Sequence, residues 1–217
     1  MKKIAIFTSF IIGFLSLGQE VLWIRVLSFA GHSVPHAFAY TLFLYLLGIA
    51  IGAFFGKKIC QKNEFNLNFL GKLFLTISIF NLLALLLVYL GVNADILGYV
   101  LTIVVISCSA LHGVVFPIAH HLGSDTTKTG AAISNVYFAN VFGCTLSPII
   151  IGFFLLDYLG TQQAFLLLIV ITLLCAAFFL ESRRVKLTTV FASAAVAVLI
   201  ALSPERLIME LSKNSHL

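Results

Sequence analysis

Long apolar runs separated by short polar segments make up almost the whole chain. Seven such runs cover residues 4–29, 35–56, 69–91, 95–119, 130–157, 162–181 and 187–203. About 20 apolar residues cross the hydrocarbon core of a bilayer, and a backbone in lipid must satisfy its own hydrogen bonds, so each run should be a helix. The pattern predicts an all-α integral membrane protein, a polytopic bundle of about seven transmembrane helices in residues 1–203, followed by a polar tail at 204–217.

The seventh run is the one whose path the pattern leaves open. Residues 187–203 are fewer than in the other runs and rich in alanine, so a re-entrant or peripheral segment is an alternative to a full crossing. If this run does cross, an odd number of spans puts the C-terminus on the side of the membrane opposite the N-terminus.

The composition agrees with a lipid environment. Of the 217 residues, 61% are hydrophobic and 10% are charged, and the mean hydropathy is +1.11. Soluble domains carry about 25% charged residues, and so few charges could not cover a surface that faces water. This excludes a soluble enzyme domain, a disordered protein and a disulfide-knit secreted module.

The basic residues predict the orientation, because cytoplasmic loops of membrane proteins are enriched in Lys and Arg. With the N-terminus in the cytoplasm, the inner face carries Lys2, Lys3, Lys57, Lys58, Lys62, Lys72, Lys128, Arg183, Arg184 and Lys186. The outer face carries only Arg25, Arg206 and Lys213. The net charge of +5 therefore concerns topology and lipid headgroups, and we expect no nucleic-acid partner.

Glu20 is the clearest candidate for a functional group within a span. A charge at the bilayer centre costs about 2.5–3.5 kcal/mol on insertion scales, which makes a carboxylate there a candidate site. It ends a small, polar face at helical spacing, made of Ser9, Gly13, Ser16 and Glu20. The alternative is a carboxyl group that only fastens helices together. Arg25 lies on another side of the helix and should extend to the outer interface beside Trp23.

The fourth and fifth runs also carry polar groups at membrane depth. His112 is a candidate for proton relay or ligand binding, or else forms a structural hydrogen bond between helices. The fifth run carries a polar stripe at helical spacing, made of Ser134, Tyr137, Asn140, Cys144 and Ser147. Pro148 should interrupt the backbone hydrogen bonds and kink this helix. The stripe suits the lining of a cavity, and equally a central helix held to its neighbours by polar contacts.

Other features indicate packing rather than chemistry. Gly48, Gly52 and Gly56 form a ladder of small residues that favours close helix contact. The four cysteines have no metal-binding spacing, so we interpret them as small core residues. The sequence contains no dinucleotide-binding, P-loop, zinc-protease or serine-nucleophile motif. We therefore expect no metal, no cofactor and no complete enzyme; the classes that remain are transporter, channel and membrane anchor.

Three elements between residues 13 and 160 resemble a known family. The first is GQEVLWIR at Gly18–Arg25 with GIAIGA at Gly48–Ala53, and the second is GVVFP at Gly113–Pro117. The third is a series of positions: Gly130, Tyr137, Asn140, Gly143, Gly152, Phe153, Leu155 and Gly160. In this order they resemble the membrane part of the fused major-facilitator-like/spermidine synthase proteins of bacteria. The chain departs from that pattern at Val141, where the family usually has threonine, and at Ser147-Pro148, where small residues or glycine are usual.

The resemblance implies a bacterial inner-membrane protein whose first six helices resemble half of a major-facilitator bundle. Arg25, Pro117, Gly143 and Pro148 would then be structural residues, like the glycine ladder. Long members of the family continue into a soluble domain that resembles aminopropyltransferases and would use decarboxylated S-adenosylmethionine. The nucleotide loop and acidic polyamine site of that domain are not in these 217 residues, so the resemblance implies the membrane part alone.

Two hypotheses about function follow. In the first, Glu20, His112, Tyr137 and Asn140 converge on a cavity that binds or transports a small cationic solute such as a polyamine. A half bundle would then need a homodimer or another subunit to transport it. In the second, the chain is a non-transporting anchor or assembly partner of a separately encoded aminopropyltransferase.

Overall fold

The computed structural model describes residues 2–30, 34–62, 66–89, 94–123 and 130–202. The expected polar tail at 204–217 and the basic residues Lys128, Arg206 and Lys213 lie outside this part of the chain. The elements are α1 (Lys2–Ala30), α2 (Val34–Lys62), α3 (Leu67–Tyr89), α4 (Ala94–Gly123), α5 (Gly130–Pro148), the π-helix η1 (Ile149–Leu155), α6 (Leu156–Tyr158), α7 (Thr161–Phe179) and α8 (Arg183–Leu202). The described residues contain no strand, as the apolar runs predict.

Six helical segments in the described residues are long and apolar enough to cross a membrane. They are α1, α2, α3, α4, the continuous segment α5–η1–α6, and α7. Each lies over one of the first six apolar runs, so the architecture is that of a multi-pass helical membrane protein. The seventh run forms α8, a helix of 20 residues, and its crossing of the membrane stays a prediction.

The helix α2 continues beyond its predicted end. The sequence analysis ends this span at position 56 and expects a polar connection after it, whereas α2 runs to Lys62. The ammonium nitrogen of Lys58 lies 4.4 Å from the centroid of the Phe54 ring. Because lysine has a long aliphatic stem, its charge can reach the membrane surface while the backbone stays helical.

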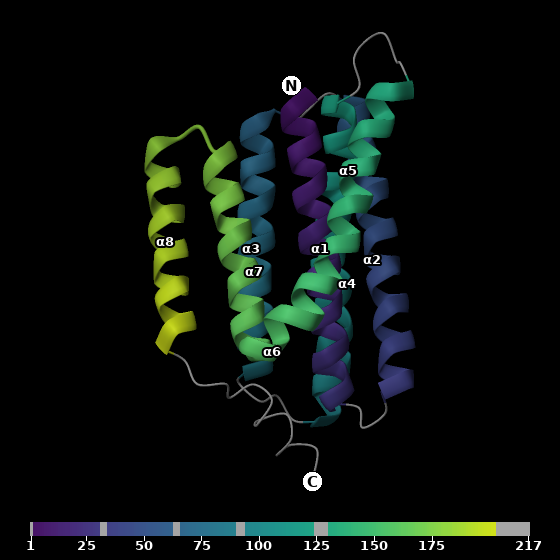
Figure 1. Cartoon of the computed structure of the whole chain (residues 1–217), viewed down its shortest axis with the longest axis vertical. Helices are drawn as coiled ribbons and strands as arrows, with labels where there is room; N and C mark the ends of the chain where they lie inside the picture. The colour runs from purple at the N-terminus through teal and green to yellow at the C-terminus, as the bar shows by residue number, and fades with distance from the viewer. Residues whose placement is uncertain (1, 31–33, 63–65, 90–93, 124–129, 203–217) are drawn as a thin grey trace.

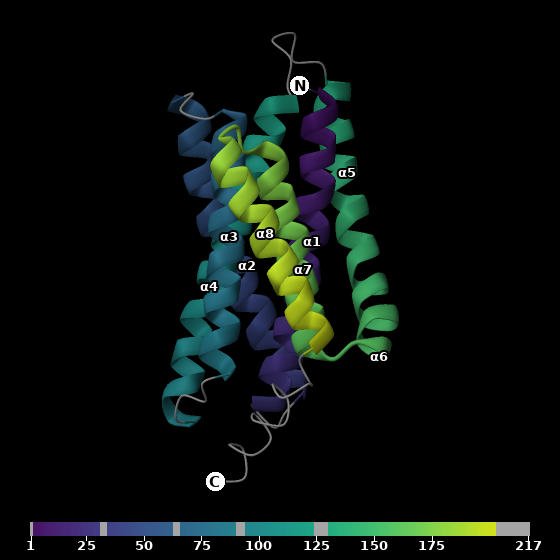
Figure 2. The ribbon, with the colours of Figure 1, turned by 90° about the vertical axis from the view of Figure 1, so that its left-hand side faces the viewer.

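The helices form an up-and-down bundle with α1 at its centre (Figure 1). The most extensive contacts pair α2 with α4, α1 with α5, α3 with α7, and α7 with α8. The helix α1 also contacts α2, α4 and α7. Figure 2 shows α5 on one side of α1 and the α2–α3–α4 group on the other. Figure 1 shows α8 at the edge of the bundle, beside α7.

The glycine ladder of α2 lies directly on the backbone of α4. Gly48 faces the carbonyl of Ile106, Gly52 that of Ala110, and Gly56 that of Val114. A Cβ atom at any of the three glycines would overlap the backbone of α4. The close approach of the two helices therefore depends on the absence of side chains along this ridge.

The helix α5 packs on α1 in a corresponding register. Gly143 faces the carbonyl of Phe10, and the Ser147 hydroxyl donates a hydrogen bond of 2.5 Å to the carbonyl of Phe14. Small residues four positions apart thus meet carbonyls four positions apart. The glycine ladder of α2 meets the carbonyls of α4 at the same spacing of four residues.

Glycines of α1 and α4 also face carbonyls of the helices that pack on them, and these two contacts match each other. Gly13 of α1 faces the carbonyl of Asn140 in α5, and Gly113 of α4 faces the carbonyl of Ile49 in α2. Helices α1 and α4 run in opposite directions (Figure 1). In this correspondence α1 is equivalent to α4 and α2 to α5. Helices α3 and α7 are equivalent in the same way, because they pack on each other, α3 contacts α4 and α7 contacts α1. Helices α1–α3 and the segment α4–α7 therefore pack as two inverted copies of one arrangement.

Trp23 belongs to the core of the bundle. Its side chain is 1% exposed, and its ring packs edge-on against Phe165 of α7 with 5.1 Å between the centroids. The indole thus faces α7, and the expectation that Arg25 extends to the outer membrane interface beside it stays a prediction. The guanidinium carbon of Arg25 lies 5.9 Å from the ring centroid of Phe29, near the end of α1.

The fifth span changes helix type where the sequence predicts an interruption. The α-helical hydrogen bonding of α5 ends at Pro148, and the next residues form the π-helix η1 before α6 resumes the α-helical pattern. Proline has no N–H to donate, so the regular ladder cannot pass through this position. A π-helical segment within a helix accommodates such a break without ending the span.

Candidate functional site

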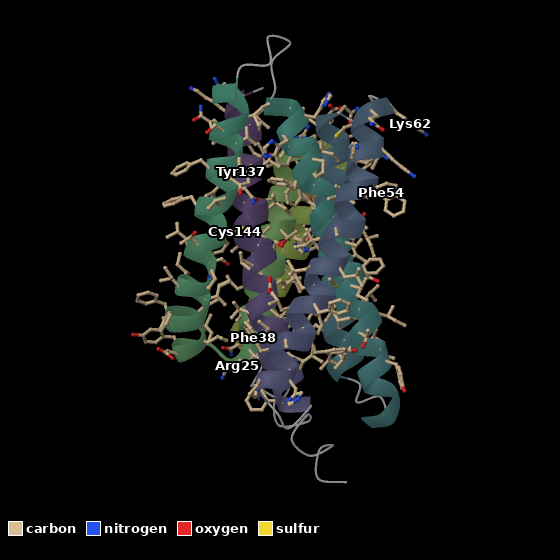
Figure 3. All side chains as sticks on the ribbon, turned by 90° about the vertical axis from the view of Figure 1, so that its right-hand side faces the viewer. Arg25, Phe38, Phe54, Lys62, Tyr137 and Cys144 are labelled. Atoms are coloured by element: carbon tan, nitrogen blue, oxygen red, sulfur yellow. The ribbon has the colours of Figure 1, made fainter. Side chains whose placement is uncertain are left out.

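The four sequence-predicted site residues line one cavity of about 320 Å³ between α1, α2, α4 and α5. Its polar lining residues are Ser16, Glu20, His112, Tyr137, Asn140 and Cys144. Figure 3 shows α5, with Tyr137 and Cys144 labelled, on one side of α1 and α2 on the other. The polar faces expected on the first, fourth and fifth spans therefore meet at one place inside the bundle.

The polar face of α1 is fixed by contacts with its neighbours. The Ser9 hydroxyl donates a hydrogen bond of 2.8 Å to the carbonyl of Val136 in α5. On the α2 side, the Tyr45 hydroxyl donates a bond of 2.7 Å to the carbonyl of Ser16. These contacts set the rotation of α1, and Glu20, one turn beyond Ser16, consequently reaches the cavity.

Glu20 reaches the cavity without a partner among the described residues. Its side chain is 6% exposed, and none of the described residues forms an ion pair or hydrogen bond with its carboxyl group. Arg25, the nearest basic residue along α1, lies against Phe29 instead. A carboxyl group in this position attracts a cation that enters the cavity.

His112 lines the cavity, and one of its ring nitrogens is held by a hydrogen bond within α4. The ring is 3% exposed, and its Nδ1 lies 2.9 Å from the carbonyl oxygen of Cys108, one turn earlier in α4. Because a carbonyl can only accept, Nδ1 carries the proton and donates it. The other nitrogen, Nε2, is then the acceptor of the neutral ring and is the atom available to a ligand.

The α5 wall supplies a carboxamide, a thiol and a phenol. The Asn140 amide nitrogen lies 3.8 Å from Sγ of Cys144, and that thiol donates to the carbonyl of Gly13 at 3.5 Å. Asn140 therefore keeps its Oδ1 as an acceptor. Tyr137 is 57% exposed, so its side chain lies at the mouth of the cavity.

The opposite wall, on α2, is apolar. It consists of Leu46, Ile49 and Ala53. In the register that relates the two halves, these positions correspond to Tyr137, Asn140 and Cys144 of α5. The cavity thus lies where the inverted copies meet, and equivalent positions carry apolar side chains on one wall and polar side chains on the other.

Sequence reasoning missed this apolar wall, because apolar residues in an apolar span carry no signal of their own. The signal that could have found this wall is a sequence repeat between the two halves of the chain. Ser9 and Gly13 in the first span have the same spacing as Ser109 and Gly113 in the fourth. Aligning the first and fourth spans on this pair relates their lining positions to each other. The second and fifth spans need their own alignment, on Gly52 and Gly143, which face the equivalent carbonyls of Ala110 and Phe10.

Other polar residues with candidate roles do not line this cavity. Ser109 is buried against Gly48 and donates to the carbonyl of Val105 at 2.8 Å. Asn81 is buried in α3. His120 and His121 line a separate cavity of about 290 Å³ near the ends of α2 and α4. Within the described ranges, no three His, Cys, Asp or Glu side chains come together in a way that could hold a metal ion.

The expected structural residues occupy helix contacts. Gly48, Gly52, Gly56 and Gly143 face backbone carbonyls, and the ring of Pro117 lies beside Gly56. The cysteines are free thiols, of which Cys60, Cys108 and Cys175 are buried and Cys144 is half-buried.

Comparisons with known proteins identify no similar protein. No protein-family model, no curated protein and no solved structure matches the chain. The functional argument accordingly rests on the cavity and on the side chains that line it.

Proposed function

We propose that this protein binds a small organic cation in the cavity between α1, α2, α4 and α5, and takes part in its transport across the membrane. The observation that carries the proposal is Glu20, a carboxyl group that belongs to a candidate membrane span, lines the cavity and has no partner among the described residues. In a medium of low dielectric, the attraction between this carboxylate and an ammonium group is much stronger than in water.

The position of the cavity supports a transport role. In many secondary transporters the substrate site lies near the bilayer midplane, at the interface between inverted repeats. Here the cavity is lined by α1 and α2 from one half and by α4 and α5 from the other. The resemblance to major-facilitator-like membrane proteins fits this interpretation, and a second copy or another subunit would supply the other half of a full bundle.

Binding measurements on Glu20 variants test the proposal. The purified protein in lipid nanodiscs is titrated calorimetrically with hexylamine, cadaverine and spermidine. Glu20→Gln should weaken binding of every cation that the wild type binds, by roughly tenfold or more, because it removes a charge-assisted hydrogen bond and keeps the side-chain shape. Glu20→Gln should also unfold at a temperature no lower than the wild type, since the neutral amide costs less to bury.

A matched control uses Glu181, an exposed residue between α7 and α8 that does not line the cavity. Glu181→Gln changes the net charge by the same amount and should leave the affinities unchanged. Equal affinities in the wild type and in Glu20→Gln would contradict the proposal. The membrane-anchor hypothesis would then be the one to pursue, by testing whether the protein retains a synthase-like partner in the membrane fraction.

A further inference from the structure

We infer that the cavity selects organic cations with a single positive charge and an apolar body, and discriminates against linear polyamines. The inference rests on the proposed function, because it concerns the ligand of the same cavity. It follows from the distribution of charged, polar and apolar side chains over the two walls.

The described lining of the cavity offers a ligand one negative charge. Glu20 is the sole acidic residue among the described residues that line the cavity. In the six candidate spans the only other acidic residue is Asp157, in the short helix α6 at the end of the fifth span. One carboxylate can neutralise one ammonium group, and a second ammonium group of the same ligand would find no counter-charge in the cavity.

The α2 wall makes a second charge more unfavourable still. Leu46, Ile49 and Ala53 offer no side-chain hydrogen-bond acceptor, and Phe116 of α4 adds a further apolar surface. An unpaired ammonium group that leaves water for such a surface loses its hydration without compensation. A methyl or phenyl group in the same place gains from burial instead.

The α5 wall and its neighbours suit one ammonium head group. An ammonium ion has several N–H donors and no acceptor, so it needs oxygen or nitrogen acceptors around it. Glu20, the Oδ1 atom of Asn140 and the Nε2 atom of His112 are acceptors on the lining that no described hydrogen bond occupies. The volume of about 320 Å³ is that of a small-molecule site, and leaves room for a short hydrocarbon or aromatic body beside the head group.

Hexylamine and cadaverine form a matched pair of probes for this selectivity. Both are linear and have the same number of non-hydrogen atoms, but the terminal methyl group of hexylamine is replaced by a second ammonium group in cadaverine. We expect hexylamine to bind the wild type at least roughly tenfold more tightly than cadaverine. Nanodiscs without protein give the signal that comes from partition into lipid, and Glu20→Gln shows how much of the remaining signal depends on the carboxylate.

Two variants of Leu46 test the wall itself. Leu46 lines the cavity and is 54% exposed, and a polar side chain at this depth carries a cost of its own, so a neutral polar variant must accompany the charged one. Leu46→Asp supplies a second carboxylate opposite the polar wall and should shift the preference toward cadaverine. Leu46→Asn has nearly the same shape without the charge, and should leave hexylamine preferred.

The outcomes separate this inference from the proposed function. If cadaverine binds the wild type as tightly as hexylamine or more tightly, and binding still depends on Glu20, the selectivity is wrong and the cation site stands. If Leu46→Asp and Leu46→Asn give the same ratio of affinities, the role of the α2 wall is wrong. If no amine binds the wild type in a Glu20-dependent manner, the proposed function fails and the inference fails with it.

Discussion

Within the cavity, the two ring nitrogens of His112 have different roles. Nδ1 donates to the carbonyl of Cys108 within α4, which holds the ring in one orientation. Nε2 is left as the acceptor that a ligand can use. The sequence analysis gives a hydrogen bond between helices as the alternative role, whereas the bond seen here lies within α4. This bond and the binding role are compatible, because they use different atoms of one side chain.

Two substitutions distinguish these roles. The amide nitrogen of asparagine lies close to the position of Nδ1, whereas the amide group of glutamine reaches the position of Nε2. If Nε2 accepts a hydrogen bond from the ligand, His112→Gln should bind hexylamine within a few-fold of the wild type. His112→Asn should lose about 1 kcal/mol, or roughly fivefold in affinity. Calorimetric titration measures both, and wild-type affinity in His112→Asn would show that Nε2 does not contact the ligand.

At the scale of helices, the contact between α2 and α4 depends on positions where no side chain fits. A Cβ atom at Gly52 would overlap the backbone of Ala110, whereas one at Gly152 in η1 would meet no atom within 4 Å. The two glycines therefore make a matched pair, in which the same substitution has opposite expectations.

Gly52→Ala should destabilise the protein by about 1–3 kcal/mol, because the helices must move apart to admit the methyl group. Gly152→Ala should be neutral, or stabilising by up to about 1 kcal/mol through its higher helix propensity. Reversible unfolding in detergent or mixed micelles measures both changes. Comparable losses in the two variants would mean that the backbone contact seen at Gly52 does not limit the packing.

The sequence predicts the elements more completely than it predicts the cavity. Apolar runs indicate the helices because a span needs about 20 apolar residues whatever it packs against. The polar residues Glu20 and Asn140 stand out for a related reason, since they are costly in lipid. The apolar partner of this polar wall does not stand out, because Ile49 is equally suited to lipid, to the core and to a ligand. Only the packing of α2 on α4 shows that Ile49 lines the cavity.

Local details also depend on packing partners. Trp23 is typical of a membrane interface by residue type, but Phe165 offers it a buried contact. The interruption at Pro148 follows from its missing N–H, whereas the π-helical form of the next residues depends on how η1 continues into α6. Residue type thus predicts where the ladder breaks and not which geometry replaces it.

At the scale of the whole molecule, the basic residues of the described chain gather at one end of the bundle. Among the described residues, every Lys and Arg except Arg25 lies near the end that holds the start of α1, α3 and α8 and the end of α2. Figure 3 shows the contrast between Lys62 at this end and Arg25 at the other. The folded arrangement therefore has the asymmetry from which the sequence analysis predicts a cytoplasmic N-terminus.

Labelling of single cysteines tests the orientation and the path of α8 together. In a variant without native cysteines, Tyr158→Cys, at a site 86% exposed at the end of α6, should react with a membrane-impermeant maleimide in intact bacterial cells. Lys58→Cys should react only after the membrane is permeabilised. These two sites lie at opposite ends of the bundle, so the reverse result would show that the predicted orientation is wrong.

The third site, Leu202, lies at the end of α8. With 20 residues and a rise of about 1.5 Å per residue, α8 is about 30 Å long, which matches the hydrocarbon core. It packs on α7 through a face of Thr189, Ser193 and Val196. We therefore expect Leu202→Cys to react in intact cells, like Tyr158→Cys. Reaction only after permeabilisation would show that α8 does not cross, and would return the chain after Leu202 to the side of its N-terminus.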